Sequence, residues 1–190
     1  MTTLTSKGST TKTKILNAAR DLLVKKGYDK LVLREVAKTC DIKLGNLQYY
    51  FPTVDDLVLA VIDVERQRDL VTVQKAIEKE RDPAAALDKI IVELVSRWRS
   101  DAGSIYATLN LLSLHHDSYK ELYDNIYANH YAELEALIAA AIPSLTKTEC
   151  AKRARLVTAL IDGSAYQTNV GTACKFFSAI IDTATNIALS

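Results

Sequence analysis

The sequence has few residues that interrupt helices and no segment typical of membrane or secreted proteins. It contains three prolines and six glycines in 190 residues, and no apolar run reaches the length needed to span a bilayer. We find no signal-peptide pattern, and the three cysteines (Cys40, Cys150 and Cys174) form no close pair, which fits a reducing compartment. We therefore expect a cytoplasmic protein that does not bind a membrane. A redox role for a cysteine stays open.

The motifs that carry most enzyme chemistry are also missing. The chain has no nucleophile elbow, no phosphate-binding loop and no paired metal motif, and its Asp and Glu residues are scattered at surface spacings. His115, His116 and His130 suggest a metal site only weakly, because adjacent histidines point to different sides of a helix and no carboxylate or cysteine completes a ligand spacing. We predict a protein that is not an enzyme and needs no cofactor or metal. Metal binding by the histidines stays the alternative.

Positive charge is concentrated in the first part of the chain. Residues 1–52 contain ten Lys or Arg against four Asp or Glu, a net charge of +6, whereas the remaining 14 basic and 19 acidic residues give −5. A basic segment of this kind neutralises nucleic-acid phosphates. Residues 1–14, with Lys7, Lys12 and Lys14, are predicted to be flexible. They either follow a DNA backbone or minor groove or form a solvated terminus.

Three short amphipathic helices are predicted between Ile15 and Phe51, the first of them ending at Gly27. Helices at about 33–40 and 43–50 follow, joined by a tight turn at Asp41-Ile42, because Asp tolerates a left-handed backbone. Such a pair fits a helix-turn-helix, whose second helix enters the DNA major groove. The apolar positions expected in the core are Ile15, Leu16, Ala19, Leu22, Leu23, Val36, Ala37, Ile42, Leu47 and Phe51.

The outward face of the second helix of this pair suits DNA recognition. Gln48 and Asn46 can pair with adenine, Leu44 can meet a thymine methyl group, and Gly45 lets the backbone approach the groove. Asn46, together with two tyrosines, could equally bind phosphates. The predicted face consists of Lys43, Leu44, Gly45, Asn46, Gln48, Tyr49 and Tyr50. The alternative is a surface that packs against another protein.

The segment GYDKLVLREVAKTCDIKLGNLQYYFPTVDDLVLAVI resembles the signature of the tetracycline-repressor-type (TetR) bacterial regulators. The likeness covers about the first third of the chain. It implies a dimeric, all-helical protein with an N-terminal DNA-binding domain and a C-terminal ligand and dimerisation domain, usually a repressor released from its operator by a small molecule. The matching residues are Gly27, Tyr28, Val36, Ala37, Gly45, Leu47, Tyr50, Phe51, Pro52, Asp56 and Leu57.

The resemblance also implies roles for individual residues. Residues matching the family's base-contacting positions are Arg34, Leu44, Gly45 and Gln48, and those matching its phosphate-contacting positions are Asn46, Tyr49 and Tyr50. The chain departs from the family in three places: Leu31-Val32 replaces hydroxyl residues that would cap a helix, Lys43 replaces a capping Ser, and Val54 replaces a frequent Lys. An interaction protein of the same fold that has lost DNA binding is therefore a second interpretation. Activation instead of repression also stays open.

Two domains are predicted, residues 1–52 and residues 53–190, with the helix 53–77 connecting them. Thr53 and Asp56 form a capping box at its start, and Asp82-Pro83 is a strong signal for the next helix. Ala102-Gly103 is expected to break the helical pattern. Further helices are predicted at about 83–98, 104–114, 118–142, 146–171 and 172–189, which makes nine or ten in all.

A small-molecule pocket is expected among the middle helices, where aromatic rings with polar groups are frequent. The candidates are Trp98, Tyr106, Asn110, His115, His116, Tyr123, Tyr127, His130, Tyr166 and Gln167. Tyrosines recur every fourth residue from Tyr119 to Tyr131, a stripe that fits core or dimer surface equally well. The resemblance implies that the last two helices form a homodimer interface; the candidates there are Leu156, Leu160, Gly163, Ala165, Phe177 and Ile181. Ordinary core packing within one chain is the alternative for these residues.

Overall fold

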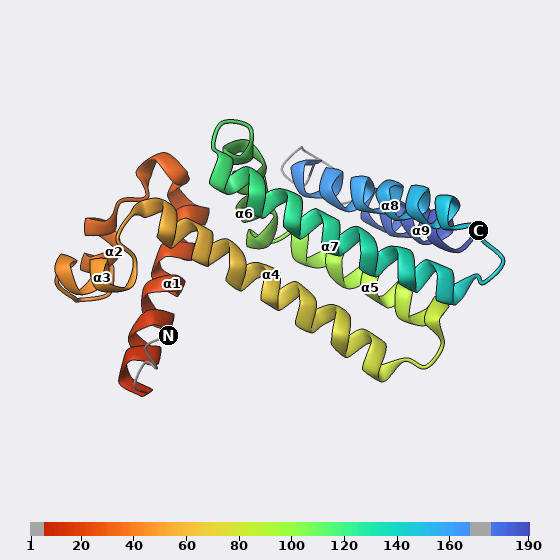
Figure 1. Cartoon of the computed structure of the whole chain (residues 1–190), viewed down its shortest axis with the longest axis horizontal. Helices are drawn as coiled ribbons and strands as arrows, with labels where there is room; N and C mark the ends of the chain where they lie inside the picture. The colour runs from red at the N-terminus through yellow and green to blue at the C-terminus, as the bar shows by residue number, and fades with distance from the viewer. Residues whose placement is uncertain (1–5, 168–175) are drawn as a thin grey trace. The chain divides into compact units, whose positions relative to one another are not determined.

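The structure, a computed structural model, describes residues 6–167 and 176–190. Over these ranges the secondary structure is helical and contains no strand, which confirms the predicted all-α class (Figure 1). The elements are α1 (Ser6–Lys26), the 3₁₀ turn η1 (Tyr28–Lys30), α2 (Leu33–Thr39), α3 (Leu44–Tyr50), α4 (Val54–Lys79), α5 (Pro83–Trp98), α6 (Asp101–Ser113), α7 (Asp117–Ala141), α8 (Lys147–Gln167) and α9 (Phe177–Leu189).

The chain divides into two compact units, Met1–Glu65 and Arg66–Ser190. The division lies inside α4, so the first turns of this helix belong to the N-terminal unit and the later turns to the C-terminal unit. The domain boundary predicted at residues 52 and 53 lies next to the start of α4. This helix begins as predicted, because the Thr53 hydroxyl accepts a hydrogen bond from the Asp56 N–H at 3.0 Å and donates one to the Asp56 carboxylate at 2.7 Å.

The N-terminal unit is a small helical bundle around one apolar core. Predicted core residues from α1, α2 and α3 are confirmed, while Leu16 and Ile42 are only partly buried. The first turns of α4 complete this core, because their apolar side chains are also shielded from water. The buried set is Ile15, Ala19, Leu22, Leu23, Leu31, Val36, Ala37, Cys40, Leu47, Phe51, Leu57, Val58, Val61 and Ile62.

The prediction of a flexible segment before Ile15 is wrong for residues 6–14, which form the first turns of α1. Side-chain contacts hold these turns against the rest of the unit. The Lys14 ammonium donates a hydrogen bond to the Cys40 carbonyl at 2.8 Å, and the Lys12 ammonium lies 5.8 Å from the centre of the Phe51 ring. Residues 1–5 lie outside the described ranges.

The turn between α2 and α3 has the backbone predicted for it. Asp41 adopts φ = 51°, the left-handed conformation that Asp tolerates, and the Ile42 N–H donates to the Ala37 carbonyl at 3.0 Å. Gly27, which ends α1, also has a positive φ, of 79°. The absence of helix-capping side chains is confirmed as well: neither Val32 nor Lys43 makes a side-chain cap bond.

Gly103 does not break the helical pattern, contrary to the prediction for Ala102-Gly103. Both residues are buried in the first turn of α6, which begins at Asp101. A methyl group on Gly103 would overlap the backbone carbonyl of Trp98 and would touch the side chain of Ala165. The glycine is thus needed where α6 packs closely against the end of α5 and against α8, and not for a turn.

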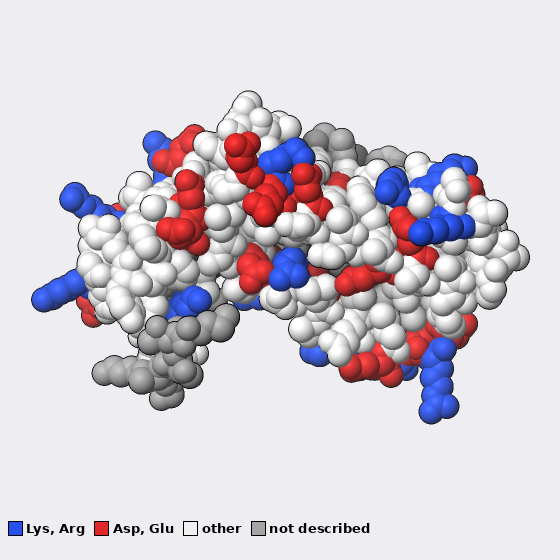
Figure 2. All heavy atoms as spheres, in the orientation of Figure 1, with Lys and Arg blue, Asp and Glu red and all other residues white. Residues whose placement is uncertain are grey.

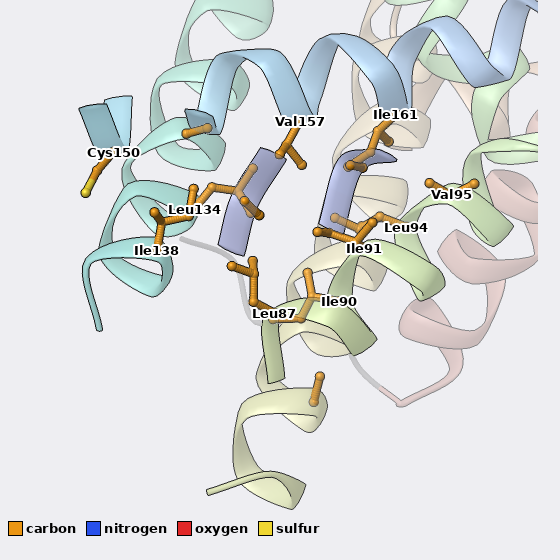
Figure 3. Packing of buried hydrophobic residues seen from close by; sticks show 14 of the residues in the cluster. Leu87, Ile90, Ile91, Leu94, Val95, Leu134, Ile138, Cys150, Val157 and Ile161 are labelled. Atoms are coloured by element: carbon orange, nitrogen blue, oxygen red, sulfur yellow. The ribbon is translucent and has the colours of Figure 1, made fainter. Parts of the chain in front are cut away.

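The C-terminal unit packs α5, α7, α8 and α9 around a second core (Figure 1). Asp82 caps α5 as predicted and accepts a hydrogen bond from the Ala85 N–H at 3.1 Å. Figure 3 shows apolar side chains of α5, α7 and α8 pointing toward one another. The labelled members of this core are Leu87, Ile90, Ile91, Leu94, Val95, Leu134, Ile138, Cys150, Val157 and Ile161.

The predicted ends of the last two helices, near Gly171 and Thr172, lie outside the described residues, and so does Cys174. Cys40 and Cys150 are buried free thiols. None of the helices in the described ranges combines the length and the apolar character needed to cross a membrane.

Candidate nucleic-acid interface and ligand pocket

Helix α3 has one buried side and one accessible side. Leu47 is fully buried and anchors the helix, whereas Tyr49 is 71% exposed. The ring of Tyr49 meets that of Tyr50 edge to face, with centroids 5.3 Å apart. No acidic residue is present in the helix. The other predicted DNA-contacting residues are also accessible in whole or in part: Arg34, Lys43, Leu44, Gly45, Asn46, Gln48 and Tyr50.

Gly45 faces open space in the described structure. A methyl group built on it meets no atom within 4 Å, so packing within the chain does not require a glycine there. A backbone without a side chain at an exposed helix position leaves room for another molecule to approach closely. Gly45 therefore fits the prediction that the backbone of α3 comes near a groove floor.

Two polar contacts fix the start of α4 within the N-terminal unit. Arg20 of α1 forms an ion pair with Glu65, with Nε and Oε1 2.6 Å apart, and the Glu65 side chain is only 1% exposed. The Tyr28 hydroxyl donates to Asp55 at 2.8 Å. These contacts hold α4 against α1 and η1 of the N-terminal unit. The buried pair could not be predicted from the sequence, because 45 residues separate its members and neither belongs to a local motif.

The positive excess of residues 1–52 is smaller over the whole N-terminal unit, because residues 53–65 add four acidic residues and no basic one. Figure 2 shows Lys and Arg side chains projecting from this unit, and the exposed basic residues near α2 and α3 include Arg34, Lys38 and Lys43. Side chains of this type bind phosphates in a sequence-independent way. The accessible face of α3 and its basic surroundings together form the candidate nucleic-acid interface.

A pocket opens within the C-terminal unit. The enclosed cavity has a volume of about 50 Å³, and the whole hollow with its open mouth contains about 550 Å³ of empty space. Four of the predicted ligand-binding residues line it: Trp98, Tyr106, Tyr127 and His130. The remaining lining residues are Arg66, Asp69, Leu70, Val73, Leu94, Ile126, Asn129 and Glu133.

Charged groups line the part of this pocket formed by α4. Asp69 accepts a hydrogen bond from the Tyr106 hydroxyl at 2.6 Å and pairs with Arg97 of α5. The ring of Tyr106 stacks on that of Trp98, with centroids 4.4 Å apart. Asp69 thus links α4 to α5 and α6 at the wall of the pocket.

Helix α7 contributes His130 and Glu133 to the lining. Burial raises the pKa of Glu133, and the charge of Arg66 lowers it in part. His130 keeps some surface exposed, yet burial of its ring lowers the pKa to about 4. The imidazole is therefore neutral near pH 7 and adds no positive charge to the pocket.

The hydroxyl group of Tyr127 contacts the carboxylate of Asp162. The Tyr127 hydroxyl donates to Asp162 Oδ2 at 2.9 Å, while Oδ1 is buried and has no hydrogen-bond partner among the described residues. Burial raises the pKa of Asp162 to about 6, and the bond from Tyr127 lowers it in part. Burial and the nearby Asp162 charge also raise the pKa of Tyr131 and of Tyr166. The Asp162 carboxylate thus accepts a hydrogen bond from one tyrosine and acts electrostatically on two others.

The other predicted ligand-binding residues are not in the lining. Asn110 donates to the Tyr123 hydroxyl at 3.3 Å, and the Tyr123 ring lies 4.4 Å from that of Tyr127, so these two adjoin the pocket. His115 and His116 are exposed, as is Tyr166. The side chain of Gln167 is outside the described structure. Among the residues that are described, no group of three His, Cys, Asp or Glu side chains is placed to hold a metal ion.

The residues predicted for a dimer interface differ in exposure. Phe177 is buried in the core of the C-terminal unit, and the Arg99 guanidinium lies 3.2 Å from the centre of its ring. Leu156 is 45% exposed. Leu160, Gly163, Ala165 and Ile181 are half-buried. Within one chain, therefore, Phe177 already has its packing partners, and the others keep surface that a second subunit can cover.

The pocket residues on α4 were missed by the sequence analysis, which described this helix only as a connection between domains. Arg66, Asp69, Leu70 and Val73 follow the i, i+3, i+4, i+7 spacing of one helix face. The mixture of charged and apolar residues on that face was the available signal. An ordinary core helix would have only apolar residues at those positions.

Three comparisons relate the chain to known proteins. Residues 15–61 match the family model of bacterial regulatory proteins, tetR family. An uncharacterized HTH-type transcriptional regulator in the dhlA 5′ region of Xanthobacter autotrophicus is 37% identical over 84 residues, which are 43% of this chain and 42% of that protein. The chain thus spans less than half the length of this curated relative.

Solved structures extend the likeness to the whole fold. A TetR transcription regulator from Haloarcula marismortui has a TM-score of 0.83 at 20% identity, over 95% of this chain and 97% of the other. A putative transcriptional regulator from Saccharomonospora viridis, solved in complex with choline, has a TM-score of 0.77 at 19% identity, over 95% and 94%. At these identities the likeness shows the fold.

Proposed function

Because residues 15–61 match the family model of bacterial regulatory proteins, tetR family, we propose that the chain is a dimeric repressor that a small molecule releases from a palindromic operator. In this function α3 reads the major groove, the basic surface binds phosphates, and the pocket of the C-terminal unit takes the effector. No catalytic step is part of the proposal. The regulator acts from the cytoplasm, where its operator lies.

One observation carries the DNA-binding part of the proposal. Helix α3 is anchored by a single buried residue, Leu47, and presents Gln48, Asn46 and an open Gly45 on a helix that has no acidic side chain of its own. Gln and Asn make bidentate bonds to adenine, and the absence of carboxylates avoids repulsion from phosphates. A surface built to pack against another protein would not need this combination.

Two further observations support the dimer and the effector. A palindromic operator requires a two-fold symmetric protein, and α8 and α9 keep apolar surface exposed at Leu156 and half-buried at Leu160 and Ile181. The pocket has the aromatic lining of a small-molecule site, and a protein of the same fold was solved with choline bound. Sedimentation of the purified protein tests the dimer directly.

The proposal is tested by fluorescence anisotropy with DNA fragments from the region upstream of the protein's own gene. The full-length protein should bind one fragment specifically, that is, in the presence of excess unrelated DNA. Gln48→Ala should weaken specific binding by roughly 5- to 100-fold and leave binding to unrelated DNA unchanged, because it removes a base contact. Tyr49→Phe should weaken both kinds of binding to a similar degree, because it removes a phosphate contact.

Asn125→Ala is the matched control, since it replaces an exposed amide on α7 of the C-terminal unit. Its affinity should equal that of the unmodified protein. If the protein forms no specific complex with any of these fragments at moderate salt, the proposal that it regulates its own gene is wrong. Equal binding by all variants would exclude α3 as the reading helix and would favour an interaction protein of the same fold.

A further inference from the structure

The charges around the pocket do not balance. Two carboxylates, Asp69 and Glu133, are in the lining, and each faces a guanidinium group, from Arg97 and Arg66 respectively. His130 is neutral near pH 7, since burial lowers its pKa to about 4. Asp162, which is outside the lining but accepts a hydrogen bond from the Tyr127 hydroxyl, is a third carboxylate. The groups at the pocket thus include three negative and two positive charges.

Tyr127 connects the carboxylate of Asp162 with the pocket. This residue lines the cavity and donates its hydroxyl hydrogen to Asp162. A phenol that donates to a carboxylate becomes richer in electrons, which strengthens the attraction of its ring for cations. Because Oδ1 of Asp162 has no hydrogen-bond donor among the described residues, its charge is only partly neutralised there. The wall at Tyr127 is therefore electronegative.

The rest of the lining favours an apolar body on the ligand. Leu70, Val73, Leu94 and Ile126 contribute aliphatic surface, and Trp98 contributes a large aromatic ring. Aromatic faces beside a carboxylate form the environment in which organic ammonium groups bind well, because such ions are weakly hydrated. An anionic ligand would meet repulsion from Asp162 at the same wall.

We propose that the effector pocket is selective for organic cations, with the cationic group against the ring of Tyr127, whose hydroxyl is bonded to Asp162, and the apolar body among the lining side chains of α4, α5 and α7. The proposal rests on the proposed function, in which this pocket receives the effector. It adds the chemical class of the ligand and the residues that select it.

Trp98 gives a direct measurement of binding, because it is the only tryptophan of the chain and lines the pocket. Its fluorescence is titrated with three compounds of similar size: phenyltrimethylammonium, the neutral isostere tert-butylbenzene, and benzenesulfonate. The cation should bind about tenfold more tightly than the neutral compound, and the anion should bind most weakly. Equal affinities, or tighter binding of the neutral compound or the anion, would overturn the proposal.

Variants identify the source of the selectivity. Asp162→Asn should bring the affinity for the cation close to that for tert-butylbenzene and should leave the neutral compound unaffected. Tyr127→Phe, which removes the bond to Asp162 but keeps the ring, should reduce the preference to an intermediate value. Asp124→Asn is the matched control: it removes one negative charge from an exposed position on α7 and should keep the full preference. Unchanged selectivity in both pocket variants would overturn the role of Asp162.

The two proposals fail in different ways. If the pocket has no preference for the cation while the protein still binds its upstream DNA, only the ligand class is wrong. If the cation binds selectively while no DNA fragment is bound specifically, the pocket assignment stands and the proposed function is wrong. Both measurements use the full-length protein, so one preparation distinguishes the cases.

Discussion

The two units of the chain use charge in opposite ways. In the N-terminal unit the basic side chains project outward, the core is apolar, and the buried ionised residue Glu65 is paired with Arg20. In the C-terminal unit, charged and titratable groups from four helices face a cavity or lie just behind its wall: Arg66, Asp69, Arg97, His130, Glu133 and Asp162.

This difference follows from what each unit would bind. A large polyanion stays outside the protein, so the charges that attract it can remain hydrated on the surface at little cost. A small molecule enters the protein, and the groups that select it must be held in place and partly removed from water. The Glu65 carboxylate therefore stabilises the fold through its ion pair, whereas we expect the Asp162 carboxylate to attract a ligand.

The largest expected effect is the loss of the buried ion pair in the N-terminal unit. Arg20→Ala leaves the Glu65 carboxylate in an environment where it is 1% exposed, and breaking such a pair costs about 3 kcal/mol or more of unfolding free energy. Urea denaturation followed by circular dichroism should show an earlier transition for this unit. Trp98 fluorescence, which reports on the C-terminal unit, should change little.

Lys25→Ala is the control for this experiment, because Lys25 is exposed on the same helix. It should change the unfolding free energy by less than about 0.5 kcal/mol. If Arg20→Ala lowers the urea midpoint measured by Trp98 fluorescence as much as the midpoint measured by circular dichroism, the two units unfold together. They would then not be independent in stability.

The N-terminal unit was largely predictable because its signals are local. The positive φ of Asp41, the capping box of Thr53 and the buried positions of Val36 and Leu47 each follow from a few neighbouring residues. The exception is the start of α1: a run of Ser, Thr and Lys has no apolar stripe, and contacts with residues distant in sequence, such as that between Lys14 and Cys40, favour a helix there.

The pocket was predictable only in part, since it depends on packing between distant helices. Trp98, Tyr106, Tyr127 and His130 were identified from their chemistry, but nothing local connects them with Asp69 or Asp162. Gly103 shows the same limit. The sequence suggests a helix breaker, but in the structure the absence of a side chain allows the backbone to pack closely against Trp98.

The inward charges of the C-terminal unit should also give it a characteristic pH dependence. The pKa of His130, about 4, is below its usual 6.5, so the unfolded state takes up the proton first and stability is lost as pH falls from 6.5 to 4. The pKa of Asp162, about 6, is above its usual 3.8, so the folded state takes up the proton first and stability is gained as pH falls from 6 to 3.8. The two effects oppose each other in the unmodified protein.

Single variants separate these contributions. Relative to the unmodified protein, His130→Gln should gain about 2 kcal/mol of unfolding free energy between pH 6 and pH 4, and Asp162→Asn should lose about 2 kcal/mol over the same range. Urea denaturation followed by Trp98 fluorescence at each pH measures both. Parallel pH curves for all three proteins would show that neither group titrates differently in the folded and unfolded states.

The smallest expected change in stability concerns Gly45 and separates folding from binding. Because a methyl group there meets no atom within 4 Å and alanine favours helices, Gly45→Ala should raise the unfolding free energy of the N-terminal unit by up to about 1 kcal/mol. The same methyl group would stand between α3 and the groove floor, and overpacking of a close contact costs about 1–3 kcal/mol. DNA affinity, measured by fluorescence anisotropy, should therefore fall although the protein is more stable.

Gly103→Ala provides the opposite case, because its methyl group overlaps the Trp98 carbonyl within the C-terminal unit. That variant should lose stability in urea denaturation, by about 1–3 kcal/mol, whether or not DNA is present. Two glycines, each inside a helix, thus have different physical reasons to lack a side chain: one gives room to a neighbour within the fold, the other to a molecule outside it. Full DNA affinity in Gly45→Ala would show that α3 does not approach the bases through its backbone, and the recognition contacts would then rest on the side chains of Gln48 and Asn46 alone.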